Sequence, residues 1–149
     1  MDSFQVVTLI RRLHLSIRAQ VIEKLRARGY EDITPAHIYV FQTPGPDGMR
    51  PTELAQRALM TKQAMNHLLA GLEERGYLER TPAAGDGRAR VLRLSPKGRR
   101  LTKLIQETAA GIERQWAAEL GPARLADVRA ALEHVDAIGA ASPNHENVR

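Results

Sequence analysis

Residues 61–98 read TKQAMNHLLAGLEERGYLERTPAAGDGRARVLRLSPKG, and their hydrophobic period changes halfway along. From 62 to 76 the apolar residues recur every three or four positions, which is the spacing of an amphipathic helix. Residues 77–81 and 88–94 then read as two strands, and the cluster PAAGDG at 82–87 predicts a turn between them. The pattern therefore predicts a helix followed by an antiparallel β-hairpin.

A second helix is predicted directly upstream, where Pro51 begins the sequence PTELAQRAL and a joint at Met60-Thr61 follows. Two helices with a short joint, followed by a hairpin, make a winged helix-turn-helix. In such a unit the second helix fits the major groove of DNA, and the hairpin lies over the adjacent backbone or minor groove. Further upstream, Thr34-Pro35 predicts the start of a short helix through Val40 or Phe41, before the turn cluster PGPDG at 44–48.

Long amphipathic helices are predicted at both ends of the chain. The first covers residues 4–25 and ends before Gly29, and two more follow the hairpin and meet at Gly121-Pro122. The tail, 142–149, is predicted to be disordered. The first helix would be about 36 Å long, as long as a small domain is wide. We therefore expect it to pack against something besides its own chain.

Basic residues are concentrated in the same central region. The 149 residues carry 22 Lys and Arg against 17 Asp and Glu, a net charge of +5. Residues 50–103 hold 12 basic and 5 acidic residues, a net of +7, which leaves −2 for the remainder. A charge run is most often only a solvated face, but this one coincides with the predicted winged helix. It predicts an anionic partner, double-stranded DNA.

The composition also excludes several classes of protein. Without cysteine there is no disulfide, thiol nucleophile or Cys-ligated zinc. The apolar runs are too short to span a bilayer and the N-terminus lacks signal-peptide features, so a cytoplasmic protein with no membrane contact is expected. The histidines lack metal-ligand spacing, which predicts no metal and no cofactor. No catalytic motif stands out, and we expect no enzyme.

Four segments resemble the MarR family of transcriptional regulators. They are the 51–56 helix start PTELAQ, the segment LEERGYLER at 72–80, the wing sequence DGRARVLRL at 86–94, and the SPKG that ends at Gly98. The resemblance covers about residues 5–138. It implies one mainly α domain over 1–149, with a winged helix-turn-helix lobe at about 34–98 and dimerisation helices at 4–30 and 99–140. It also implies a homodimer that reads a pseudo-palindromic operator.

The motif assigns DNA contacts to the second helix and to the wing. Arg88 is expected at the wing tip in the minor groove, with Asp86 orienting its guanidinium. Arg90, Arg93 and Lys97 are expected to contact phosphates. In the helix, Gln63 and Asn66 can pair with adenine, and Thr61 either binds a phosphate or merely caps the helix. The helix face predicted to meet DNA is completed by Lys62 and His67.

Two further predictions depend on the family. His14 and His37 are placed in the cleft where relatives bind small aromatic or phenolic effectors, although a lone His near an apolar face is more often structural. His67 and Gly71 depart from the family pattern, and Gly71 has no explanation in the sequence. The predicted function is a ligand-responsive repressor. The alternative is a winged helix that binds only proteins, which the localised positive charge disfavours.

Overall fold

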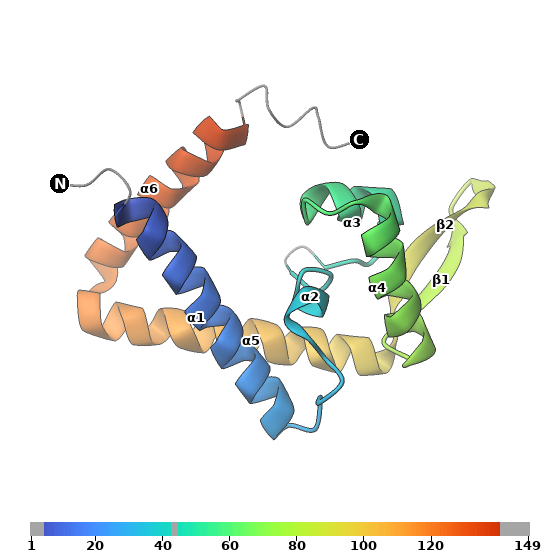
Figure 1. The fold of residues 1–149 in the computed structure, drawn as a ribbon, viewed down its shortest axis with the longest axis horizontal. Helices are drawn as coiled ribbons and strands as arrows, with labels where there is room; N and C mark the ends of the chain where they lie inside the picture. Colours follow the sequence, from blue (N-terminus) through green and yellow to red (C-terminus); the bar gives the residue numbers. More distant parts are fainter. Residues whose placement is uncertain (1–4, 43–44, 141–149) are drawn as a thin grey trace. The chain divides into compact units, whose positions relative to one another are not determined.

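The computed structural model describes residues 5–42 and 45–140, and its elements follow the predicted order (Figure 1). The fold is mainly helical with one two-stranded antiparallel hairpin, as predicted for a winged helix-turn-helix. The tail at 142–149 and Pro44 of the turn cluster lie outside the described residues. The elements are α1 (Gln5–Ala27), α2 (Pro35–Ile38), α3 (Pro51–Arg57), α4 (Lys62–Glu74), β1 (Leu78–Ala83), β2 (Asp86–Leu94), α5 (Pro96–Leu120) and α6 (Pro122–Ala140).

The chain divides into two compact units, Met1–Ala109 and Ala110–Arg149, and α5 runs from the first into the second. Helix α2 is shorter than predicted, because it ends at Ile38 and continues only as turns towards Phe41. Within the described ranges no helix is both long enough and apolar enough to cross a membrane.

The first unit builds its own hydrophobic core. Side chains from every helix of this unit and from both strands meet there, and many are fully buried. They include Leu25, Ile33, Phe41, Met65, Leu69, Leu72, Tyr77, Leu92 and Leu101, each at most 1% exposed. Burial of this extent is the main favourable term in folding. It holds α4 and the hairpin in a fixed relation to the rest of the lobe.

Helix α4 begins and ends on local signals that the sequence contains. Thr61 has extended backbone angles, and its Oγ1 accepts a hydrogen bond from the Ala64 amide at 3.1 Å, as an N-cap does. Gly76 follows the helix with a φ of +77°, a conformation that disfavours other residues. The chain therefore turns directly from α4 into the hairpin.

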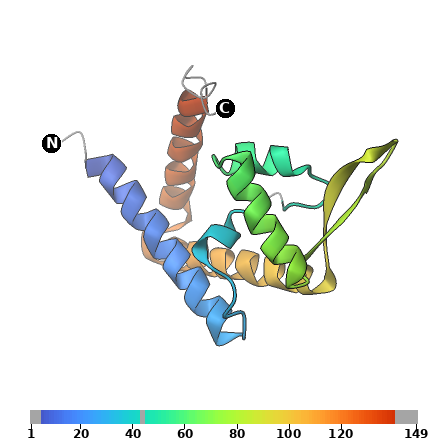
Figure 2. The same ribbon diagram turned by 45° about the vertical axis from the view of Figure 1, so that its right-hand side comes forward.

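The hairpin is longer and its turn shorter than the sequence predicts. Leu78 pairs with Leu94 and Thr81 with Val91, and the turn is confined to residues 84–85. The prediction of a turn over 82–87 was wrong, because Pro82 and Ala83 continue β1 on an irregular register. The resulting wing projects away from α3 and α4 (Figure 2).

At the base of the wing, residues 47–49 form hydrogen bonds with β2. The Gly48 amide donates to the Leu92 carbonyl at 2.8 Å, and the Leu92 amide donates to the Met49 carbonyl at 2.9 Å. The Asp47 carboxylate accepts from the Leu94 amide at 2.6 Å. This part of the predicted turn cluster therefore pairs with β2, and only the distal half of the hairpin lacks such support.

Helix α5 begins in close contact with the end of α4. Ser95 Oγ donates to the Gly76 carbonyl at 2.5 Å and accepts from the Gly98 amide at 3.0 Å. A Cβ at Gly98 would lie 2.1 Å from the Tyr77 carbonyl oxygen, so only glycine fits there. The glycine of the family motif thus permits a backbone approach.

The second unit is far more open than the first. Burial decreases along α5, from Ile112 at 5% exposed to Leu120 at 43%, with Trp116 half-buried between them. Helix α6 buries none of its side chains. Within this unit Arg129 forms an ion pair with Glu113 at 3.1 Å, on exposed surface where such pairs contribute little.

Candidate nucleic-acid interface

Helix α4 presents a polar face on the side opposite the core. Met65, Leu69 and Leu72 are buried on one side. The residues predicted to contact DNA lie on the other side and are exposed, apart from the half-buried Asn66: Lys62, Gln63, Asn66 and His67. Thr61 caps the helix, which is one of the two roles that the sequence allows it. The arrangement leaves amide, imidazole and ammonium groups available to a groove.

The wing carries exposed arginines on a backbone that Asp86 organises. Asp86 Oδ1 accepts from the amides of Arg88 at 3.1 Å and Ala89 at 3.2 Å, at the irregular part of the register. No ion pair joins the side chains of Asp86 and Arg88 within the described part of the chain. The expectation that Asp86 orients the guanidinium is corrected: it shapes the main chain that carries Arg88. Arg90 is exposed on the same strand.

Two of the predicted phosphate contacts turn back onto the protein. Lys97 Nζ donates to the Arg75 carbonyl at 3.0 Å and lies 4.1 Å from the centre of the Tyr77 ring. The guanidinium of Arg93 lies over Gly48, with Nη1 3.2 Å from the position of a Cβ there. Lys97 thus stabilises the lobe at the position observed, whereas Arg88, Arg90 and Arg93 are exposed to solvent.

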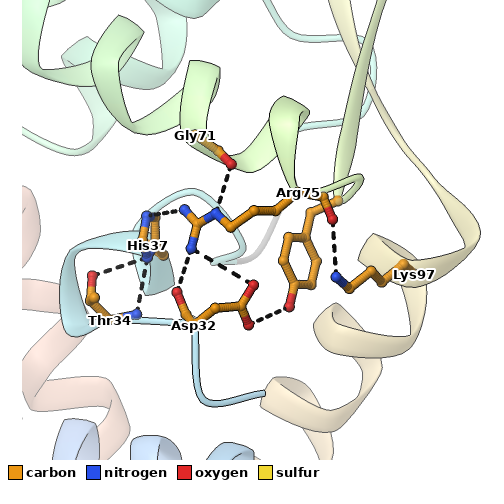
Figure 3. Close-up of polar contacts among 7 residues, drawn as sticks. Asp32, Thr34, His37, Gly71, Arg75 and Lys97 are labelled. Carbon is orange, nitrogen blue, oxygen red and sulfur yellow. Dashed lines mark hydrogen bonds and ion pairs between the residues drawn. The ribbon is translucent and has the colours of Figure 1, made fainter. Parts of the chain in front are cut away.

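A polar cluster joins the C-terminal end of α4 to α2 and the segment before it (Figure 3). The Arg75 guanidinium bonds the Gly71 carbonyl at 2.7 Å and the Asp32 carbonyl at 2.5 Å, and it lies 3.0 Å from His37 Nε2. Tyr77 donates its hydroxyl proton to Asp32 Oδ1 at 2.7 Å. We call these four side chains, of Asp32, His37, Arg75 and Tyr77, the Arg75 cluster.

His37 is 7% exposed, and its position differs from the prediction. It contacts the Thr34 amide through Nδ1 at 3.0 Å and borders a hollow with residues of α4, whereas His14 lies elsewhere on α1. Burial and the nearby Arg75 charge lower the pKa of His37 below the ordinary value of 6.5, against a smaller opposing effect of Asp32. The structure therefore does not bring the two histidines into one site.

His14 belongs to a second cluster, with Arg18 and Tyr39. The Tyr39 hydroxyl lies 3.3 Å from Arg18 Nη1 and 3.4 Å from His14 Nε2, and the His14 and Tyr39 rings stack with centroids 6.4 Å apart. Arg18 Nε is buried without a hydrogen-bond partner among the described residues. Arg18 also lines a hollow of about 400 Å³ with Leu15, Ala19, Ile22, Glu23, Arg26 and Pro35.

Neither Arg18 nor Arg75 is among the site residues predicted from the sequence. Arg18 follows His14 by four positions on a helix, so their shared face was a signal that could have found it. Arg75 gives no such signal, because Asp32 and His37 are separated from it by 43 and 38 residues. No group of three or more potential metal ligands occurs in the described residues.

The helix pair and the wing define a winged-helix protein. Residues 31–89 match the sequence model described as "MarR family". Solved structures of that family match about nine-tenths of the chain. The chain is therefore similar to the MarR family in sequence over residues 31–89 and in fold over most of its length.

Named relatives agree with this class. The exopolysaccharide II synthesis transcriptional activator ExpG of Rhizobium meliloti is 28% identical over 74% of this chain and 57% of its own length. The HTH-type transcriptional repressor Rv2887 of Mycobacterium tuberculosis is 30% identical over 58% of this chain and 62% of its own length. Both matches thus span less than two thirds of the relative's own length.

Two solved structures illustrate the fold. Rv2887, crystallised with salicylic acid, is similar over 90% of this chain and 98% of its own, with 26% identity and a TM-score of 0.65. Streptococcus pneumoniae FabT, crystallised with DNA, is similar over 89% of this chain and 96% of its own, with 22% identity and a TM-score of 0.68. Because the identity to FabT is this low, the similarity to FabT concerns the fold alone.

Proposed function

We propose that the protein is a transcriptional regulator that binds double-stranded DNA through α4 and the wing. The observation that carries the proposal is the exposed polar face of α4 beside a wing with exposed Arg88 and Arg90, within a segment of net charge +7. In this arrangement wing arginines supply phosphate or minor-groove contacts, and Gln63 and Asn66 select bases.

Selection of duplexes from a random pool, followed by a salt series, tests DNA binding. We expect an enriched sequence and an affinity that falls steeply and log-linearly as salt rises, because bound cations release counterions from the phosphates. A flat salt dependence contradicts the electrostatic part of the proposal. Binding without any enriched sequence contradicts base selection by α4 and favours a purely architectural role.

We propose further that the protein works as a homodimer. The N-terminal half of α1 and helix α6 expose large apolar side chains, each 42% to 66% exposed: Val6, Val7, Leu9, Ile10, Leu13, Leu15, Val128, Leu132 and Val135. Apolar surface on this scale is typical of an interface. A second copy accounts for it, and a two-fold dimer would place two α4 helices about 34 Å apart, one turn of DNA. Sedimentation at micromolar concentration should give twice the chain mass of 16.5 kDa.

An aromatic carboxylate is the effector that we propose for the second cluster. Arg18 combines a neighbouring hollow with a buried Nε that has no hydrogen-bond partner among residues 5–42 and 45–140, and His14 and Tyr39 add ring surface. A guanidinium pairs strongly with a carboxylate, and the relative Rv2887 was crystallised with salicylic acid. Binding to one dimer geometry would shift the spacing of the α4 helices and release DNA, which is repression relieved by ligand.

Titration with salicylate tests this effector site. We expect salicylate to lower the affinity of the wild-type protein for its selected duplex, and Arg18→Met to abolish that response. Arg11→Met, on exposed surface of the same helix, is the matched control and should retain it. If Arg18→Met responds like wild type, the Arg18 site is wrong.

A further inference from the structure

The Arg75 cluster connects the helix proposed to read DNA with a segment more than thirty residues away. Arg75 lies just beyond the last residue of α4, and its guanidinium bonds the Asp32 carbonyl and approaches the Asp32 carboxylate at 3.8 Å. It also approaches His37 on α2, while its backbone carbonyl accepts from Lys97 of α5. One side chain thus ties the end of α4 to α2 and to the segment before it (Figure 3).

The protonation state of His37 decides whether its ring can accept a hydrogen bond within this connection. Both ring nitrogens face donors: the Thr34 amide lies 3.0 Å from Nδ1, and Arg75 Nη2 lies 3.0 Å from Nε2. A neutral imidazole accepts at one nitrogen, so at any time only one of these two donors has an acceptor in the ring, whereas an imidazolium accepts at neither. Protonation therefore removes that remaining acceptor and places a second positive charge against the guanidinium.

The other charged groups around His37 offset only part of this repulsion. Asp32 faces it from the preceding segment, but its carboxylate already accepts from Tyr77 and pairs with Arg75. From α4, His67 and Glu74 line the same hollow as His37, and Glu74 is exposed to solvent. Arg75 remains the charged group nearest to the ring, at 3.0 Å.

Gly71 supplies the space in which this geometry forms. A Cβ at Gly71 would lie 3.1 Å from Arg75 Nη2, closer than ordinary contact. Its absence lets the guanidinium fold back over the last turn of α4 and bond the Gly71 carbonyl. The glycine that the sequence leaves unexplained is therefore explained by the path of the Arg75 side chain.

We propose that Arg75 and His37 are positioning residues for the recognition helix, and that sequence-specific DNA binding is constant from about pH 7.5 to about pH 6.5 and weakens from there to about pH 5 as His37 gains a proton. This rests on the DNA-binding function proposed above. Contacts from the wing to phosphates do not depend on the cluster. The loss should therefore fall on the selected duplex and spare binding to unselected DNA.

The test measures the affinity of the full chain for a duplex selected by the wild-type protein and for sheared unselected DNA, at fixed ionic strength across this pH range. For the wild type we expect the logarithm of specific affinity to fall by up to about one unit per pH unit for each protomer, the limit for one linked proton. In His37→Gln, which accepts a hydrogen bond without titrating, the profile should flatten. Arg75→Lys keeps the charge but not the planar fork, and should lower specific affinity at every pH.

His134→Gln is the matched control, because His134 is an exposed histidine of α6 outside the proposed DNA interface. It should retain the pH dependence that His37→Gln loses. If His37→Gln keeps the wild-type profile, or His134→Gln removes it, the proposal is overturned although DNA binding stands. If the wild type selects no duplex at all, the proposed function fails, and the pH proposal fails with it.

Discussion

Helices α4 and α6 are both predicted as amphipathic, but their surroundings differ. Helix α4 places Met65, Leu69 and Leu72 at 0% exposure in a core completed by its own chain. Helix α6, six residues longer, buries no side chain and leaves Leu132 at 50% exposure and Val135 at 57%. Packing of an apolar face supplies most helix stability. The first region obtains that packing within a single copy, and the proposed dimer would supply it to the second.

The largest effect is expected where the central lobe is tightest. In Gly98→Ala the added Cβ would meet the Tyr77 carbonyl at 2.1 Å, so the backbone must move. We expect the free energy of unfolding to drop by about 4 kcal/mol. Gly111→Ala is the control, because its Cβ meets only the tip of Arg114 at 3.7 Å. That change should stabilise by up to about 1 kcal/mol through helix propensity. Urea unfolding measures the free energy of unfolding of both variants. If Gly98→Ala and Gly111→Ala change it equally, the close approach at Gly98 does not matter for stability.

A pair of leucines compares the two regions directly. Leu72→Ala empties a fully buried site and should cost about 3 kcal/mol in urea unfolding. Leu132→Ala, at a half-exposed position, should leave the unfolding of the dilute protein nearly unchanged and raise the dimer dissociation constant. Sedimentation over a dilution series measures the second effect. A Leu132→Ala protein that dimerises like wild type would show that α6 is not part of the interface.

A smaller effect, on DNA alone, is expected at the wing. Arg88→Ala should lower DNA affinity about tenfold and leave unfolding unchanged, because the side chain is exposed. Arg124→Ala, an exposed arginine of α6, is the control and should bind like wild type. Fluorescence anisotropy of a labelled duplex gives both affinities. Equal affinity for Arg88→Ala and wild type would argue against a DNA contact by the wing.

The smallest effect is the pH dependence of stability that His37 contributes. Its pKa is lowered in the folded state, so the unfolded chain binds the proton more readily. The stabilisation is fully present above the ordinary value of about 6.5 and is lost as the pH falls through the lower folded pKa. His37→Gln should remove this part of the stability profile. An unchanged profile in urea unfolding between about pH 5 and 7.5 would contradict the assignment.

Local patterns in the sequence predicted most of the fold. The spacing around Leu69 and Leu72 identified α4, Gly76 identified its end, and the alternation before Leu94 identified β2. The turn between the strands was misplaced because Pro82 normally marks a turn, whereas here it continues β1 at an irregular register. Such choices depend on pairing between strands, which composition does not report.

The candidate site was predictable only in part, for a similar reason. Faces and exposure follow from helical spacing, so the polar face of α4 was identified. Helical spacing does not predict which partner a long side chain reaches. Lys97 bonds the Arg75 carbonyl, and Asp86 bonds amides rather than a guanidinium. The Arg75 cluster depends on residues far apart in sequence, which only the folded chain brings together.

Trp116 has a practical consequence that follows from its place in the chain. It is the single tryptophan of the sequence, half-buried on α5 in the second unit, where side chains become progressively more exposed. Its indole emission therefore reports the solvent polarity around α5 in the second unit and not around the wing. Unlabelled protein thus has a built-in optical probe of the proposed self-association, separate from any signal placed on DNA.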